Sequence, residues 1–219
     1  DKKRLPIANV DTNSMSSATG FYSTTEDVCK YFNAQIIGSN QLLKDSSKKE
    51  MQTEVWRVKN TEDKRKYGLG FILTTIGKRT VFGHSGGFPG QITNSMCDPK
   101  NNLVVVVLIN CIDGPARDMA KGIISVIDYF DNNYSLETQD TFGKFEGRLM
   151  NLWAINDVIS MGNKIVSVSP ETWTPFKNPE VLAYVNDTTL KVVKTESFYS
   201  EGELVHYNFD EKNHIKSVI

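Results

Sequence analysis

The run Leu103–Ile109 (LVVVVLI) constrains the fold more than any other feature of the sequence. It is short, wholly apolar and mostly β-branched, which predicts a buried strand rather than a helix. Because side chains alternate between the two faces of a sheet, such a strand needs apolar cover on both faces. A helix predicted to begin at Pro115 can cover one face. We expect the other face to need material from outside this chain.

Turn-forming residues place this strand in an antiparallel meander. Turns at Gly77-Lys78, at Phe88-Pro89-Gly90 and at 98–102 separate predicted strands at 67–75, 79–87, 91–97 and 103–109. Two short helices are predicted upstream. The first begins at Ser23 or Thr24, where either residue could cap it, and the second begins near residue 45. The helix after Pro115 has an apolar stripe that consists of Met119, Ile123, Ile124, Ile127 and Phe130. The predicted fold class is α+β, an antiparallel sheet with packed helices.

The pattern of predicted secondary structure changes near residue 138. Short β-rich segments follow one another, separated by turns, and Val205, Tyr207 and Phe209 alternate with polar neighbours. This pattern is typical of a small all-β meander or barrel. We therefore predict two domains, at residues 1–134 and 138–219.

Composition excludes several classes of function. The 25 Lys and Arg residues balance 26 Asp and Glu residues, so no basic excess points to nucleic acid. No apolar run approaches the roughly 18 residues that a membrane-spanning helix needs. The three cysteines and three histidines lack the spacing of metal ligands. We predict no metal and no cofactor.

The segment Gly83-His84-Ser85-Gly86-Gly87 carries the chemistry of interest. It ends a predicted strand just before a tight turn. Acyl-transfer enzymes need backbone N–H donors aimed at the oxygen that becomes negative, and glycine lets a substrate approach a strand closely. A neighbouring hydroxyl or cationic side chain can hold a substrate carboxylate. By itself the segment is equally compatible with a glycine-rich strand end whose histidine only makes a structural hydrogen bond.

The order of motifs around this segment resembles that of a known family. The motifs are, in order, Ala18-x-Gly20-x-x-Ser23-Thr24-x-x-Asp27, Tyr67-Gly68-Leu69-Gly70, the 83–87 segment with Gly90, Asp98-Pro99 and residues 103–110. Over residues 15–130 they resemble the C-terminal half of penicillin-binding, class C β-lactamase-like serine hydrolases, which include D-alanyl-D-alanine carboxypeptidases, β-lactamases and esterases.

The resemblance implies roles for four residues. The family's third active-site motif, Lys or His, then Ser or Thr, then Gly, falls on His84, Ser85 and Gly86. It implies that the Ser85 hydroxyl contacts a substrate carboxylate and that His84 assists electrostatically or in proton transfer. The backbone N–H of Gly87 would be one of two oxyanion donors.

The resemblance also places the nucleophile elsewhere. The family's Ser-x-x-Lys and Tyr-x-Asn motifs precede the region matched here, so we expect both before residue 1. Ser46-Ser47-Lys48-Lys49 and Tyr31-Phe32-Asn33 match these patterns literally but in reversed order. We interpret Ser46 as a helix cap and Tyr31 as part of the apolar face of its helix.

The tail more weakly resembles the lipocalin-like β-domain appended to some relatives, through Phe145-x-Gly147-Arg148 and Asn151-x-Trp153. Such a domain could be a lid or docking module, or a structural appendage, or it could bind a small apolar ligand. A large cavity inside it would favour the last alternative.

Together these features support one leading hypothesis and one rival. The chain is expected to be the C-terminal portion of a serine hydrolase that acts through an acyl-enzyme on a small-molecule or peptide substrate. Its partner would be the N-terminal half that bears the nucleophile, and this chain alone would be inactive. The rival is a non-catalytic pseudoenzyme or a peptide- or cell-wall-binding module. The family resemblance implies an extracytoplasmic location, and a homo-oligomer is a further possibility.

Overall fold

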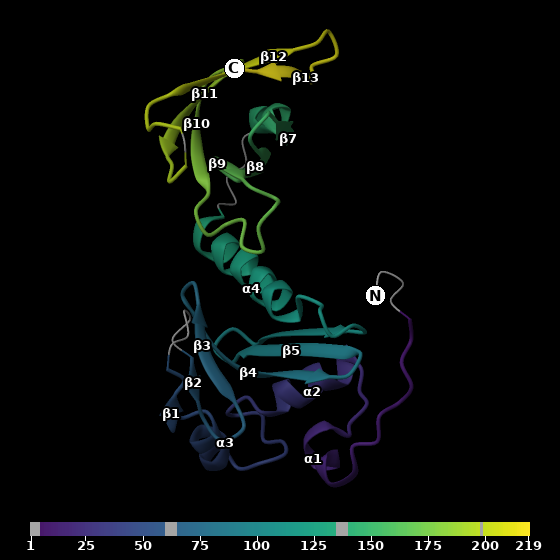
Figure 1. Cartoon of the computed structure of the whole chain (residues 1–219). Coiled ribbons are helices and arrows are strands. Elements are labelled where there is room, and N and C mark those ends of the chain that lie inside the picture. Colours follow the sequence, from purple (N-terminus) through teal and green to yellow (C-terminus); the bar gives the residue numbers. More distant parts are fainter. Residues whose placement is uncertain (1–4, 60–64, 135–139, 198) are drawn as a thin grey trace. The chain divides into compact units, whose positions relative to one another are not determined.

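The computed structural model describes residues 5–59, 65–134, 140–197 and 199–219. The chain forms two compact units, residues 1–124 and residues 125–219 (Figure 1). The division falls inside helix α4 (Ala116–Asn133), which gives its first half to unit 1 and its second half to unit 2. The sequence-based assignment instead placed the boundary after this helix, and it stays a prediction.

Unit 1 contains a six-stranded antiparallel sheet in the order β1-β2-β3-β4-β5-β6. The strands are β1 (Trp56–Arg57), β2 (Lys66–Tyr67), β3 (Ile72–Ile76), β4 (Arg79–Phe88), β5 (Gln91–Asp98) and β6 (Leu103–Ile109). The predicted meander is therefore present, and so is the predicted strand at 103–109.

The single strand expected at 67–75 is instead broken into β2 and β3. A Cβ atom added at Gly68 would lie 2.1 Å from the carbonyl oxygen of Met51, and Gly70 has a φ of +79°. The backbone N–H of Leu69 donates to that same Met51 oxygen at 3.0 Å. The glycines therefore let the chain bend tightly against the end of a helix, where a continuous strand could not pass.

Short helices precede the sheet: η1 (Asn13–Met15), α1 (Ser16–Thr19), α2 (Thr25–Ala34) and α3 (Asp45–Met51). Thr24 caps α2, and its hydroxyl accepts a hydrogen bond from the backbone N–H of Asp27 at 3.2 Å. Phe32 on α2 packs against Phe71 and Phe82 of the sheet.

Two sequence interpretations of these helices are wrong. Tyr31 is exposed rather than part of the packed face. The face of α2 that packs against the sheet contains Phe32 and, one helical turn earlier, Val28, and Ile36 just after the helix joins the same cluster. Ser46 lies inside α3 and does not cap it. The residue at the cap position is Lys44, whose side chain makes no capping bond.

Helix α4 covers the opposite face of the sheet from α2 (Figure 1). Within unit 1 its contact residues are Ala120 and Ile124, which pack against Met96 and Val105. The predicted stripe is partly wrong, since Met119 and Ile123 are exposed. Alanine lets the helix approach the strands closely, so the packed face is the one with the smaller side chains.

Strand β6 has cover on both faces, to different extents. Val105 and Val107 contact the α4 side, and Val104 joins the cluster around Phe32 of α2. Further along the α2 side, Leu108 is exposed. Among the described residues, cover on this face therefore ends before the strand does. The expected need for outside material stays a prediction.

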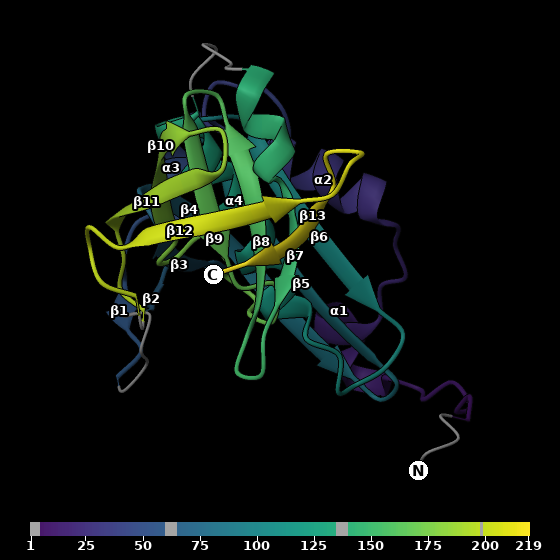
Figure 2. The same ribbon diagram turned by 90° about the horizontal axis from the view of Figure 1, so that it is seen from above.

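Unit 2 is a seven-stranded antiparallel up-and-down sheet in the order β13-β12-β11-β10-β9-β8-β7. A short helix, η2 (Asp140–Phe145), precedes strands β7 (Gly147–Met150), β8 (Ile155–Met161), β9 (Lys164–Val168), β10 (Glu180–Asn186), β11 (Thr189–Lys194), β12 (Leu204–Phe209) and β13 (Ile215–Val218). The sheet curves strongly and is nearly barrel-shaped, with β12 running across the direction of β8 and β9 (Figure 2).

The curved sheet of unit 2 packs on both faces. Phe142 and Phe145 of η2 fill part of its inner side, against Leu182, Leu190 and Tyr207. On the outer side, residues from the second half of α4 pack against Met161 and Val166. None of the helices in the described ranges is both long and apolar enough to cross a membrane.

Candidate active site

The end of β4 forms a free sheet edge. Residues 79–83 of β4 pair with β3, and Phe82 and Gly83 also pair with β5 on the other side. From His84 to Phe88 the strand pairs with β5, and no second strand of the described chain pairs with its other side. The glycine-rich segment therefore presents backbone groups along an open edge.

The hairpin register shows which amides face that edge. Phe88 and Gln91 flank the two-residue turn Pro89-Gly90, so they exchange backbone hydrogen bonds with each other. In an antiparallel ladder such pairs alternate with pairs whose N–H and C=O groups point away from the partner strand. Gly87 and Ser85 fall in the second class. Their N–H groups therefore point outward, as an oxyanion donor requires.

The reason for having glycine differs among the positions of this segment. A Cβ atom at Gly83 would lie 1.9 Å from the carbonyl oxygen of Ser95, so packing alone requires glycine there. At Gly86 it would lie 2.8 Å from the Thr93 hydroxyl oxygen. At Gly87 it would meet only Ile112, at an ordinary 3.7 Å. Internal packing therefore leaves room for a side chain at Gly87, and the open edge is what its small size keeps accessible.

His84 is held by two hydrogen bonds. Its Nδ1 lies 2.6 Å from the carbonyl oxygen of Ser85, and its Nε2 lies 2.5 Å from the hydroxyl of Tyr67. A carbonyl can only accept, so Nδ1 must carry a proton. In the neutral ring Nε2 is then the acceptor, and the Tyr67 hydroxyl donates to it. The lone pair of His84 is thus directed at Tyr67.

Tyr67 is the site residue that sequence reasoning missed. It lies on β2, and its ring stacks on that of Trp56 with centroids 4.7 Å apart. It also meets the His84 ring edge-on, at 5.8 Å. The signal available in the sequence was the conspicuous Tyr67-Gly68-Leu69-Gly70 motif, whose glycines bend the chain just after Tyr67. The motif alone did not show which residue the hydroxyl meets.

Ser85 is exposed, and its register partner on β5 is Asn94. As neighbours in a strand, His84 and Ser85 project toward opposite faces of the sheet. Ser85 borders a small recess together with Asn94 and two cationic residues of α4, Arg117 and Lys121. The recess at Ser85 therefore has cationic residues on its wall, each of which also has a partner within the protein.

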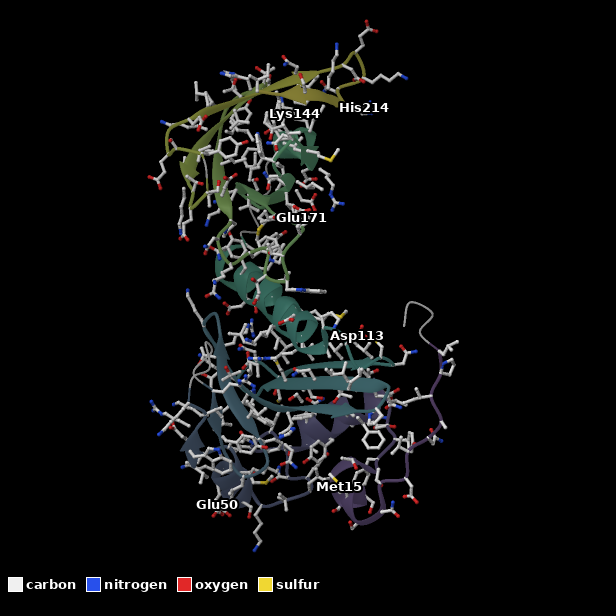
Figure 3. All side chains as sticks on the ribbon, viewed as in Figure 1. Met15, Glu50, Asp113, Lys144, Glu171 and His214 are labelled. Carbon is white, nitrogen blue, oxygen red and sulfur yellow. The ribbon has the colours of Figure 1, made fainter. Side chains whose placement is uncertain are left out.

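A larger hollow of about 1120 Å³ borders the glycine end of the strand. Its walls are the N-terminal segment at 5–12 and 18–22, residues 86–91, Thr93 and the loop at 110–113. Figure 3 labels Asp113, which lies in the loop that borders the hollow, and Met15, which lies between the two N-terminal wall segments in the sequence. Phe21 and Tyr22 in this wall are exposed. The free edge therefore opens onto a wide, partly apolar surface.

The literal Ser-x-x-Lys match does not form a catalytic pair. Ser46 and Lys49 are both exposed on α3, and no hydrogen bond joins them. The sequence analysis did not predict the role of the neighbouring Lys48. This residue is completely buried, and its Nζ donates to Ser39 Oγ at 2.6 Å. The same Nζ also donates to the Ile36 carbonyl oxygen, and the Ser39 hydroxyl donates to that of Ala34. These bonds tie down the end of α2, which is a structural role.

The remaining reactive side chains are dispersed. No group of three or more His, Cys, Asp or Glu residues in the described part of the chain could hold a metal ion. All three cysteines are free thiols. Burial, reinforced by the charge of Asp98, raises the pKa of the Cys97 thiol to about 12. Cys97 is therefore a poor nucleophile.

Comparison with known proteins gives one family and several distant structures. The family described as Beta-lactamase matches residues 1–126. No curated protein matches the sequence. The octameric penicillin-binding protein homologue from Pyrococcus abyssi is 17% identical with a TM-score of 0.46, over 86% of this chain and 44% of that chain. SurE with D-Leu is 15% identical with a TM-score of 0.38, over 88% of this chain and 46% of that chain. This chain spans less than half the length of either structure.

Proposed function

The chain belongs to the beta-lactamase family through residues 1–126, and we propose that it supplies the substrate-binding strand and half of the oxyanion hole of an acyl-transferring serine hydrolase. The reaction class is hydrolysis of an amide or ester through an acyl-enzyme. Carboxypeptidase, β-lactamase and esterase activities are the candidates within that class. An extracytoplasmic location is part of the same proposal.

The observation that carries the proposal is the free edge of β4 at Gly87. The register turns the Gly87 N–H away from β5, and nothing in the packing of the described residues forbids a side chain there. An N–H fixed in a sheet needs no reorganisation when a negative oxygen forms beside it. The neighbouring residues add to this arrangement, since Ser85 lies beside cationic side chains of α4.

In this proposal His84 acts together with Tyr67. The Tyr67 hydroxyl donates to Nε2 while Nδ1 is held by the Ser85 carbonyl, so the ring has one orientation and one neutral tautomer. The single lone pair of Nε2 faces Tyr67, so the proton that Nε2 can take is that of the Tyr67 hydroxyl, which would leave a phenolate and an imidazolium. Nε2 can return that proton without movement of the ring. His84 thereby links β4 to the hydroxyl of Tyr67 on β2.

The nucleophilic serine of the proposed enzyme comes from outside these 219 residues. Ser46 and Lys49 of the literal match are exposed and share no hydrogen bond. The buried Lys48 forms hydrogen bonds that fix the end of α2. A non-catalytic module that binds peptides through the same edge is the rival function. The two differ in whether a serine elsewhere in the encoded polypeptide becomes acylated.

The test compares Gly87→Pro with Gly87→Ala in the full encoded polypeptide. Proline removes the N–H, whereas alanine keeps it and has room. Loss of one oxyanion donor costs about 10²- to 10³-fold in kcat. We expect that loss for proline and a small change for alanine, read from acylation by a fluorescent penicillin or a fluorophosphonate. Thermal melting of both variants checks the fold.

Each outcome decides. Labelling that falls in Gly87→Pro but not in Gly87→Ala supports the hydrolase. Saturable binding of a D-alanyl-D-alanine peptide without acylation supports the rival. Labelling of the 219-residue chain alone that disappears in Ser46→Ala would overturn our assignment of the nucleophile.

A further inference from the structure

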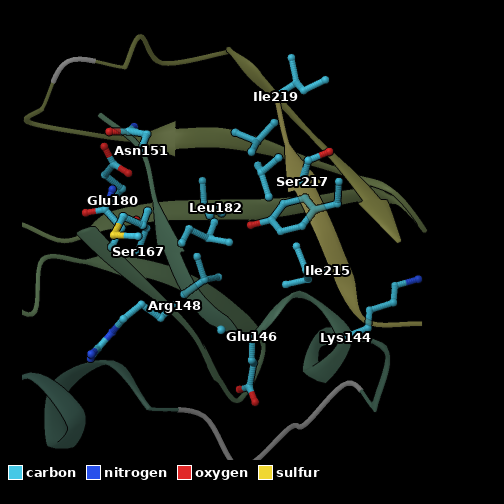
Figure 4. Close-up of a pocket in the computed structure, with 18 of the residues that line it drawn as sticks. Lys144, Glu146, Arg148, Asn151, Ser167, Glu180, Leu182, Ile215, Ser217 and Ile219 are labelled. Atoms are coloured by element: carbon cyan, nitrogen blue, oxygen red, sulfur yellow. The ribbon is translucent and has the colours of Figure 1, made fainter. Parts of the chain in front are cut away.

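The curved sheet of unit 2 encloses a hollow separate from the β4 edge. Its volume is about 630 Å³, within the range of small-molecule sites. The helix η2 fills only part of the inner side of the sheet, and the hollow occupies the rest. In Figure 4, Asn151, Ser167 and Glu180 gather on one side of the hollow, and Ile215, Ser217 and Ile219 lie on the other.

Glu180 is a buried carboxylate on the wall of this hollow, only 7% exposed. The hydroxyls of Thr195 and Ser197 both donate to its Oε1. Among the described residues no lysine, arginine or histidine forms an ion pair with it. A buried charge normally has an opposite charge beside it, because leaving it unpaired is costly. Among the described residues Glu180 therefore has hydroxyl donors on one oxygen and no ion-pair partner.

Tyr207 gives a second, independent sign of a missing partner. It lines the same hollow and is 2% exposed, and its hydroxyl makes no hydrogen bond. Buried hydroxyls are nearly always bonded. Burial, reinforced by repulsion from Tyr199 when that phenol is also ionised, raises the pKa of Tyr207 to about 12, so the hydroxyl remains a donor. Tyr199 also lies on the wall and is within electrostatic reach of Glu180.

The buried aliphatic members of the wall are Val158, Leu182 and Val192. Charged residues also border the hollow, and two of its cations, Lys144 and Arg148, pair with Asp187 and Asp157. We propose that the hollow binds an elongated amphiphile whose cationic amine head pairs with Glu180, whose apolar body passes Leu182 and Val192, and whose far end carries a hydrogen-bond acceptor for the Tyr207 hydroxyl. The apolar wall favours a hydrocarbon body, and the unpaired carboxylate selects its charge. This proposal concerns unit 2 and is independent of the hydrolase assignment.

The test titrates the 219-residue chain with three probes of equal chain length, n-octylamine, n-octanol and n-octanoate, by calorimetry and by NMR shifts of unit 2. We expect saturable binding of the amine, weaker binding of the alcohol and least binding of the carboxylate. Glu180→Gln should weaken the amine about tenfold, because a charge-assisted bond is lost, and leave the alcohol unchanged. Glu211→Gln, on an exposed turn, is the matched control.

Tyr207→Phe separates a binding role from a structural one. Since the hydroxyl has no partner in the protein, its removal should leave the melting temperature unchanged or raised. Binding of 8-amino-1-octanol, whose far hydroxyl can accept from Tyr207, should fall several-fold, whereas n-octylamine, which has no acceptor at that end, should bind the variant like the wild type. The proposal is overturned if n-octylamine does not saturate, if n-octanoate binds as well as the amine, or if Glu180→Gln binds the amine like the wild type.

Discussion

The two halves of strand β4 share one backbone but differ in what surrounds them. Residues 79–83 pair with β3, the last two of them also with β5, and are mostly buried, whereas residues 84–88 pair only with β5 among the described strands and are mostly exposed. Each half contains glycine. In the first half glycine is required because Ser95 leaves no room for a side chain at Gly83. In the second half Gly87 has that room, so its smallness serves the open edge.

The difference shows that each glycine of a glycine-rich motif has to be examined separately, because one can be required by packing while another serves the site. The buried half anchors the strand through packing and through the ion pair between Arg79 and Asp98, whose Nη1 and Oδ2 lie 2.7 Å apart. The exposed half uses that anchor to hold its amides still. If this division is right, substitutions in the first half should affect stability, and those in the second half should affect chemistry.

Breaking the Arg79–Asp98 pair should have the largest effect on stability. Both side chains are buried, and Asp98 also accepts from Lys100 N and Asn101 Nδ2. Arg79→Met would leave a buried carboxylate without its cation and should lower the free energy of unfolding by about 3–5 kcal/mol. Urea denaturation measures this. Arg57→Met, which breaks an exposed pair with Glu54, is the control and should have a much smaller effect on the free energy of unfolding.

Exchanging glycine for alanine tests the two halves directly. Gly83→Ala places a methyl group 1.9 Å from a backbone oxygen, so a strand must shift, at a cost of about 1–3 kcal/mol or a failure to fold. Gly87→Ala should melt close to the wild type. Equal destabilisation by both substitutions would show that the two halves do not differ in packing.

Acid should weaken the buried half selectively. Burial tends to raise the pKa of Asp98, but hydrogen bonds from Asn101 and Arg79 and the positive charge of Arg79 outweigh it and hold the pKa below 3.8. The stabilisation is therefore present at pH values above 3.8 and is lost as the pH falls through the folded-state pKa. Unfolding free energies measured along a descending pH series should decline there, and Asp98→Asn should flatten that decline.

Removing the Tyr67 hydroxyl should affect the exposed half with little loss of stability. Tyr67→Phe deletes the donor to His84 Nε2, at a cost of about 0.5–1.5 kcal/mol. Nitrogen-15 chemical shifts of the neutral ring should report the Nδ1–H tautomer in the wild type and a mixture in the variant. A wild-type ring protonated on Nε2 would contradict the assigned hydrogen bonds.

The sequence allowed the meander to be predicted because turn residues and apolar strands alternate along it. The position of the 83–87 segment at a strand end followed from the same pattern. Sequence could not separate Gly83 from Gly87, since the difference depends on Ser95 across the hairpin. The contact between Tyr67 and His84 depends on the bend at Gly68. The face of α4 was misjudged because close approach favoured Ala120 over larger apolar neighbours.

Unit 2 was foreseen as a meander or barrel, but its polar features were not. Tyr207 was correctly placed in an alternating strand, yet alternation does not show that its hydroxyl lacks a partner. Glu180 gave no signal, because a glutamate at a strand start is ordinarily exposed. Both depend on how the sheet curves, which is a property of the whole unit rather than of any segment.

The most direct test of the free edge is amide hydrogen exchange along β4 of the 219-residue chain. The register predicts that the His84 and Gly86 amides, which face β5, are protected, and that the Ser85 and Gly87 amides exchange rapidly. In the buried half the Gly83 amide, which faces β3, should be protected as well. If the Gly87 amide is as protected as that of Gly86, the edge is closed and Gly87 does not offer its N–H to a substrate.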